Sequence, residues 1–162
     1  MTALRWLLLA AAAFVVGAVF WWNAAESPWR QPVAGLAAYD YGLDRTPVLA
    51  VQHFANVQDA SGRIALENAL IRLLARTDLP RGARDETCRL LALIGTDRSL
   101  PVLERMAADS SAGFLAIAAL MELPGPGADD ALLRALGRAP QDNRERSEER
   151  RVGKECRSRW AP

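Results

Sequence analysis

Apolar residues recur at intervals of three and four along the middle of the chain, which is the spacing of one face of an α-helix. Residues 64–75 show this most fully, with the stripe Leu66, Ala69, Leu70, Leu73 and Leu74. A shorter stripe follows Thr46-Pro47, a pair that favours a helix start, and comprises Val48, Val51 and Ala55. The pattern predicts helices over 46–57 and 64–75, joined by a turn at 59–62.

Four further helices are predicted over about 81–94, 100–107, 114–121 and 128–136. Gly95 and Gly137 are expected to end the first and the last of them, and Asp97 to cap the second. The expected core-facing positions are Cys88, Leu91, Ile94, Leu100, Leu103, Met106, Ala107, Phe114, Ile117, Ala118, Met121, Ala128, Leu132, Leu133 and Leu136. Six short helices joined by turns indicate an all-α fold of about three antiparallel helix pairs.

The apolar pattern also repeats. Leu91–Gly95 aligns with Leu120–Pro124 at an offset of 29 residues, and Leu103 aligns with Leu133 at an offset of 30. Leu73 precedes Leu103 by 30 residues as well. A helix-turn-helix unit with a period near 30 indicates a short α-solenoid over residues 46–138, in which each unit stacks on the next.

The stretch 84–103 resembles HEAT-type repeats of the short bacterial, lyase-like kind. In those repeats one helix ends in an apolar-Gly-x-Asp turn, and the next helix opens with a proline followed by a leucine. The matching residues here are Gly95, Asp97, Pro101 and Leu103. The second copy departs from the pattern, with Pro124-Gly125-Pro126-Gly127 in place of the turn. The resemblance implies a solenoid that binds other proteins, and it transfers no functional residue to this chain.

The N-terminal residues 1–25 are expected to direct the chain to the bacterial cell envelope. Arg5 precedes an uncharged apolar run over 6–25, which is long enough to span a bilayer. Trp21-Trp22 favours a retained transmembrane anchor, with the domain outside the cytoplasmic membrane. The alternative is a signal peptide cleaved after Val16-Gly17-Ala18, which would make the protein periplasmic or secreted. Residues 26–45 are expected to be a linker.

The C-terminal residues 139–162 lack an apolar period and are expected to form a disordered tail. Within them, residues 146–160 resemble the in-frame translation of a widely used short-read sequencing adapter. Lys154, the only lysine of the chain, lies inside this stretch. The resemblance implies that residues 146–160 are not native and that the native protein continues beyond about Arg144.

Few residues are candidates for chemistry. His53 is the only histidine, which excludes a metal site built on two histidines. Cys88 lies in an apolar stripe and is expected to be a small buried hydrophobe, and a disulfide with Cys156 stays open. The helix dipole is expected to account for Asp85-Glu86 and Asp129-Asp130, near predicted helix starts. We therefore expect no catalytic, cofactor-binding or metal-binding residue.

The expected function is that of a non-catalytic protein-interaction scaffold outside the cytoplasmic membrane. Its partners would be the membrane, through residues 1–25, and a protein on the repeat surface at 46–138. The net charge of +1 argues against a nucleic-acid partner. The alternative is that these repeats are an N-terminal accessory of a longer exported enzyme or cofactor-binding protein.

Overall fold

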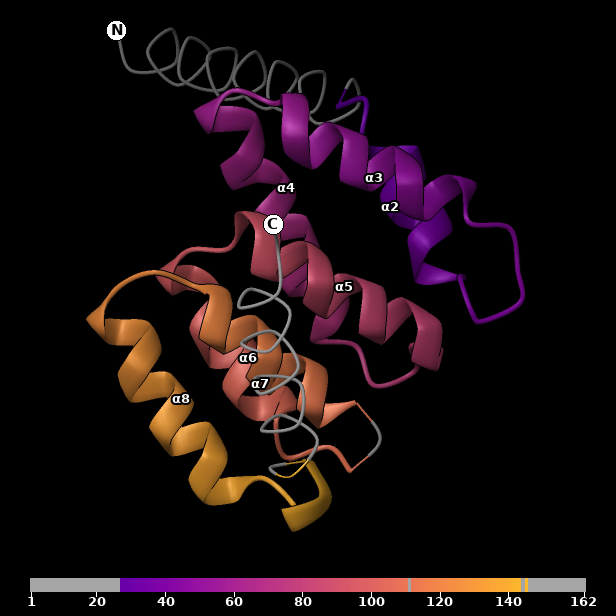
Figure 1. The fold of residues 1–162 in the computed structure, drawn as a ribbon. Helices are drawn as coiled ribbons and strands as arrows, with labels where there is room; N and C mark the ends of the chain where they lie inside the picture. Colours follow the sequence, from indigo (N-terminus) through magenta and orange to yellow (C-terminus); the bar gives the residue numbers. More distant parts are fainter. Residues whose placement is uncertain (1–26, 111, 144, 146–162) are drawn as a thin grey trace, which may run out of the picture.

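The computed structural model describes residues 27–110, 112–143 and 145, and the helices within them form the fold in Figure 1. In chain order they are α2 (Arg30–Ala37), α3 (Thr46–Val57), α4 (Ala60–Leu74), α5 (Arg81–Ile94), the 3-10 helix η1 (Asp97–Ser99), α6 (Leu100–Met106), α7 (Gly113–Glu122) and α8 (Pro126–Arg138). The all-α fold class is therefore confirmed for this part of the chain. The predicted export segment 1–25 and the adapter-like residues 146–160 lie outside the described residues.

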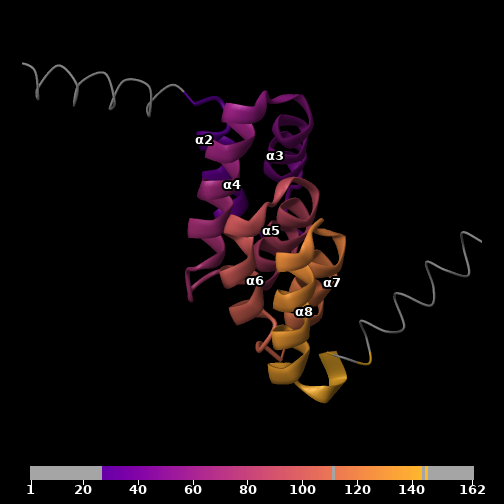
Figure 2. The same ribbon diagram turned by 90° about the vertical axis from the view of Figure 1, so that its left-hand side faces the viewer.

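The helices are stacked in chain order, with α2 near one end and α8 near the other (Figure 1 and Figure 2). Alternate helices lie against each other, because α5 packs on both α3 and α7, and α6 packs on α8. Four consecutive pairs also pack, namely α2 on α3, α4 on α5, α6 on α7 and α7 on α8. Two layers result, with α3, α5 and α7 in one and α4, α6 and α8 in the other. Among the helices described here, none is both long and apolar enough to cross a membrane.

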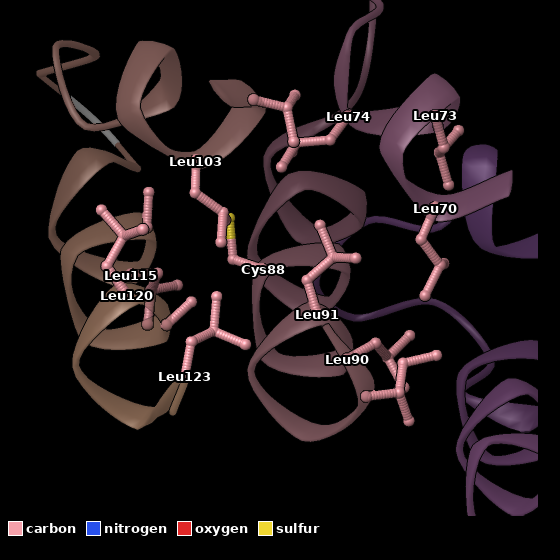
Figure 3. Close-up of a cluster of buried hydrophobic side chains, with 14 of the residues drawn as sticks. Leu70, Leu73, Leu74, Cys88, Leu90, Leu91, Leu103, Leu115, Leu120 and Leu123 are labelled. Atoms are coloured by element: carbon pink, nitrogen blue, oxygen red, sulfur yellow. The ribbon is translucent and has the colours of Figure 1, made fainter. Parts of the chain in front are cut away.

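A continuous apolar core runs along this stack. Figure 3 shows leucines of α4, α5, α6 and α7 converging, with Leu103 of α6 beside Cys88 of α5. Each fully buried leucine contributes roughly 1.5–3 kcal/mol relative to an exposed one. The predicted stripes of α3, α4 and α5 are confirmed, since every one of their positions is buried: Val48, Val51, Ala55, Leu66, Ala69, Leu70, Leu73, Leu74, Cys88, Leu91 and Ile94.

The segment predicted as a linker instead contains α2. Leu36 is fully buried, Tyr39 is 4% exposed, and the helix packs on α3. Pro32 lies in the first turn of α2, where a missing N–H costs nothing because the helix has no acceptor for it. Gly35 permits the packing, since a Cβ there would lie 2.8 Å from the Cβ of Pro47. The prediction of a linker over 26–45 is therefore wrong for this helix, in which both proline and glycine are part of the packing.

Helix ends follow local hydrogen bonding. The predicted turn at 59–62 is instead the cap and first turn of α4, because the Asp59 carboxylate accepts from the Gly62 N–H at 2.7 Å. Thr96, rather than Asp97, caps η1. Gly95 does follow the end of α5, where a Cβ would lie 2.3 Å from the Leu91 carbonyl oxygen. Gly137 does not end its helix, since α8 continues to Arg138.

Two predicted core positions are wrong. Leu133 is 69% exposed and Met121 is 42% exposed. In α8 the buried positions are Ala128, Ala131 and Ala135, which form a face of small side chains at helical spacing. This face lets α8 approach α6 and α7 closely, and it leaves Leu133 pointing to solvent. The prediction placed leucines on the buried face of this helix, whereas close packing here requires the smaller side chain of alanine.

The beginning of the predicted disordered tail is also ordered. Ala139 is 4% exposed, Asn143 is fully buried, and residues 141–143 are helical. The Asn143 side chain donates from Nδ2 to the Asp109 carbonyl oxygen at 2.7 Å. This bond ties the segment after α8 to the loop between α6 and α7, and it explains why a polar stretch without an apolar period is held in place.

Glu67 of α4 places a carboxylate inside the molecule, with only 1% of its surface exposed. Its Oε1 accepts from the Thr96 backbone N–H at 2.7 Å, the Thr96 hydroxyl at 2.9 Å and the Ser99 hydroxyl at 2.6 Å. Thr96 precedes the 3-10 helix η1, and Ser99 is its last residue before α6. The side chain therefore ties α4 to the connection between α5 and α6.

Replacing Glu67 by alanine leaves the buried Ser99 hydroxyl without its acceptor, so we expect the free energy of unfolding to fall by about 3 kcal/mol. Glu67→Gln keeps an acceptor oxygen in the same place, and we expect a loss of about 1 kcal/mol. Urea denaturation followed by far-UV circular dichroism measures both values. Equal losses in the two variants would contradict the hydrogen-bonding role.

A pair of leucine truncations tests the assignment of core and surface. Leu103 is fully buried, so we expect Leu103→Ala to lower the free energy of unfolding by about 3 kcal/mol. Leu133 is 69% exposed, and we expect Leu133→Ala to change it by less than about 0.5 kcal/mol. The same denaturation experiment compares them, and a large loss at Leu133 would show that its side chain is covered.

Candidate functional site

The residues considered for catalysis do not form a reactive centre. His53 is exposed on α3, with its ring against that of Phe54. Cys88 is fully buried in α5, as expected from its apolar stripe. Burial, with a smaller effect from the charge of Asp85, raises the pKa of the Cys88 thiol to about 12. At neutral pH the sulfur is therefore a protonated part of the core and not a nucleophile.

The acids between α2 and α3 have structural roles. The Asp40 carboxylate accepts from the Gly82 N–H at 2.9 Å, and this hydrogen bond is the main cause that lowers the pKa of Asp40. Asp44 accepts from the Thr46 N–H at 3.0 Å, at the start of α3. Within the part of the chain that the structure describes, histidines, cysteines and acids form no group of three suited to a metal ion.

Asp85 and Glu86 of α5 are buried, so the helix dipole alone does not account for them. Tyr41 donates its hydroxyl to Asp85 at 2.5 Å, and burial followed by this bond raises the pKa of Tyr41 to about 12. Arg45 and Arg89 both contact the Glu86 Oε1, at 3.3 and 2.7 Å. These contacts fasten the loop between α2 and α3 onto α5. The other acid pair, Asp129-Asp130, is exposed near the start of α8.

A hollow of about 200 Å³ lies between α3 and α5 above this network. It is lined by Arg45, Val48, Gln52, Glu86, Arg89, Leu90 and Leu93. Both of its arginines contact the same Glu86 oxygen. Their positive charge is therefore already engaged, and the hollow offers little to a charged ligand.

A larger hollow of about 330 Å³ lies on the other layer, at the ends of α4 and α6 and beside the start of α5. We call it the arginine hollow, and it is lined by Leu74, Ala75, Arg76, Thr77, Arg84, Val102, Arg105, Met106 and Asp109. Its guanidinium groups come from three separate segments of the chain. Its remaining walls are largely aliphatic, so a polar ligand there would be partly shielded from water.

The charges of the arginine hollow are unequally matched. Arg76 forms two hydrogen bonds to Asp78, at 3.0 and 2.8 Å, and Arg84 contacts Asp109 at 3.1 Å. The Nε of Arg84 is buried and has no hydrogen-bond partner among the described residues. Across residues 27–110, 112–143 and 145, no ion pair engages Arg105, which is exposed. One positive charge therefore remains in excess, which makes this hollow the candidate site.

Sequence reasoning did not identify the arginine hollow. Arg76, Arg84 and Arg105 are spread over thirty positions of the chain, among other arginines that are exposed on helix surfaces. Taken singly, each of these arginines is expected to be a solvated surface residue. Only the stacking of α4, α5 and α6 brings the three side chains to one hollow.

Comparison with known proteins gives no relative to which this site can be matched. No family model, no curated protein and no solved structure matches the chain.

Thiol labelling tests the position of Cys88. In the variant Cys156→Ser, Cys88 is the only thiol, and we expect almost no reaction with Ellman's reagent at pH 8 in the native protein. One equivalent should react after denaturation in guanidinium chloride. The matched variant Cys88→Ala shows whether the reagent works under native conditions on Cys156. Rapid reaction of native Cys88 would mean that the thiol is reachable.

Proposed function

We propose that this chain is a non-catalytic protein-interaction scaffold, exposed outside the cytoplasmic membrane, and that its helices form a HEAT-like α-solenoid. The single observation that carries the proposal is the arginine hollow, a concave and charged surface assembled by successive helices of the stack. Solenoids bind partners on surfaces of this kind, which neighbouring units build together.

The solenoid part of the proposal is supported by contacts that recur at the period of the sequence. Glu67 accepts from Thr96 across 29 positions, and Arg134 donates to Glu104 at 2.6 Å across 30 positions. Each bond joins one predicted unit to the next, which is where a solenoid is held together. The apolar run 6–25 after Arg5 supports the location outside the membrane.

The scaffold role is also favoured by what the polar groups of the described residues do. The buried carboxylates of Glu67, Asp85 and Glu86 each have at least one oxygen engaged by a hydrogen-bond donor or guanidinium group of the fold, and the second oxygen of Asp85 is buried out of reach of a substrate. A catalytic acid or base must instead reach a substrate in a cleft. Charge at the surface of the stack is therefore the feature left for recognition.

Photocross-linking in the native cells tests the scaffold. A photoreactive phenylalanine analogue replaces Thr77, an exposed residue that lines the arginine hollow, and in a matched strain it replaces exposed Asp129 of α8. We expect Thr77 to give a cross-linked band of discrete mass that is weak or absent at Asp129, because partners contact one face. No band at either position, or the same bands at both, would contradict the proposal.

A further inference from the structure

We propose that the arginine hollow binds the carboxylate of an acidic peptide segment of the partner, an inference that rests on the proposed scaffold function. Arg105 of α6 supplies the cation that no described residue engages, and the Arg84 guanidinium, which contacts Asp109 at 3.1 Å, lies in the same lining. A carboxylate carries one negative charge and has two oxygens that accept from a guanidinium group, so it suits the single cation that Arg105 offers.

The shape of the hollow suits a short side chain better than a large ligand. Its volume of about 330 Å³ is at the lower end of the roughly 300–1,000 Å³ typical of ligand pockets. The methylene and methyl groups of Leu74, Val102 and Met106 line it beside the arginines. A Glu side chain fits this combination, because its stem is apolar and its head is charged.

The charge balance favours a carboxylate over a phosphate. Arg76, Arg84 and Arg105 give three positive charges, and Asp78 and Asp109 remove two of them, which leaves a surplus of one. A phosphate with close to two negative charges would be only half neutralised.

The hollow between α3 and α5 also contains two arginines, but both of them are already engaged. Its two arginines, Arg45 and Arg89, share the oxygen of Glu86. A peptide carboxylate there would have to displace Glu86, whose side chain is only 7% exposed and would be left buried without its partners. The two hollows have arginines of the same type, and only the arginine hollow has a cation to spare.

Isothermal titration calorimetry tests the proposal on the full chain in a non-ionic detergent. The probe is a blocked peptide of alternating Ala and Glu, and the control probe has Gln in place of Glu. We expect binding of the Glu peptide only, and binding that weakens as salt is raised, because exposed charges are screened. Arg105→Gln should weaken it about tenfold or more, since a hydrogen bond between charged groups is lost.

Arg98→Gln is the matched control, because Arg98 is also exposed and lies in η1, away from the lining of the hollow. We expect its affinity for the Glu peptide to stay within about twofold of the parent chain. Equal binding of both peptides, equal effects of the two substitutions, or displacement of the peptide by inorganic phosphate at a lower concentration would each overturn the carboxylate site. If the peptide test fails but the photocross-linking experiment gives a specific band at Thr77, the scaffold proposal stands and only the carboxylate site is overturned. If the Glu peptide binds as expected but no specific cross-linked band forms at Thr77, the scaffold proposal is overturned instead.

Discussion

The helices of this protein are short, and a short helix is only marginally stable in water without neighbouring helices. Isolated helices shorter than roughly 12–15 residues are marginal in water, and α4, the longest described, runs only from Ala60 to Leu74. Each helix is therefore stable only where its apolar face meets that of another. The leucines shared by α4, α5 and α6 supply this contact along the stack (Figure 3). The order of the helices, the turns between them and the hollows at their ends all follow from that dependence.

The stack also depends on polar groups that lie inside it. Apolar faces alone let neighbouring helices slide, because dispersion and hydrophobic contacts have little directionality. The Glu67 carboxylate acts at a defined point, since it accepts from both Thr96 and Ser99. Tyr41 and Arg45 do the same for the loop before α3, through Asp85 and Glu86. These bonds set where each connection lies, and so they set which side chains reach the hollows.

The helices that could be predicted are those whose signals are local. The helices over 46–57 and 81–94 match α3 and α5, because a threonine-proline start, a following glycine and a regular apolar stripe act within one turn or two. The prediction failed where a residue acts through a distant neighbour. Gly35 lets α2 approach Pro47, and the alanines of α8 turn Leu133 outward. Neither effect can be seen without the partner helix.

Residue spacing was enough to predict the helices of residues 46–138, the buried faces of α3, α4 and α5, and the place of Cys88 in the core. These properties depend on spacing along one helix, which the order of residues contains in full. Spacing did not predict that Glu67, Asp85 and Glu86 are buried, and it did not predict that Arg76, Arg84 and Arg105 share one hollow; both depend on how the helices stack. An ionised side chain on a helix is exposed to solvent unless other groups compensate for its burial. Those donors, acceptors and charges come from other helices, so the spacing along one helix does not reveal them.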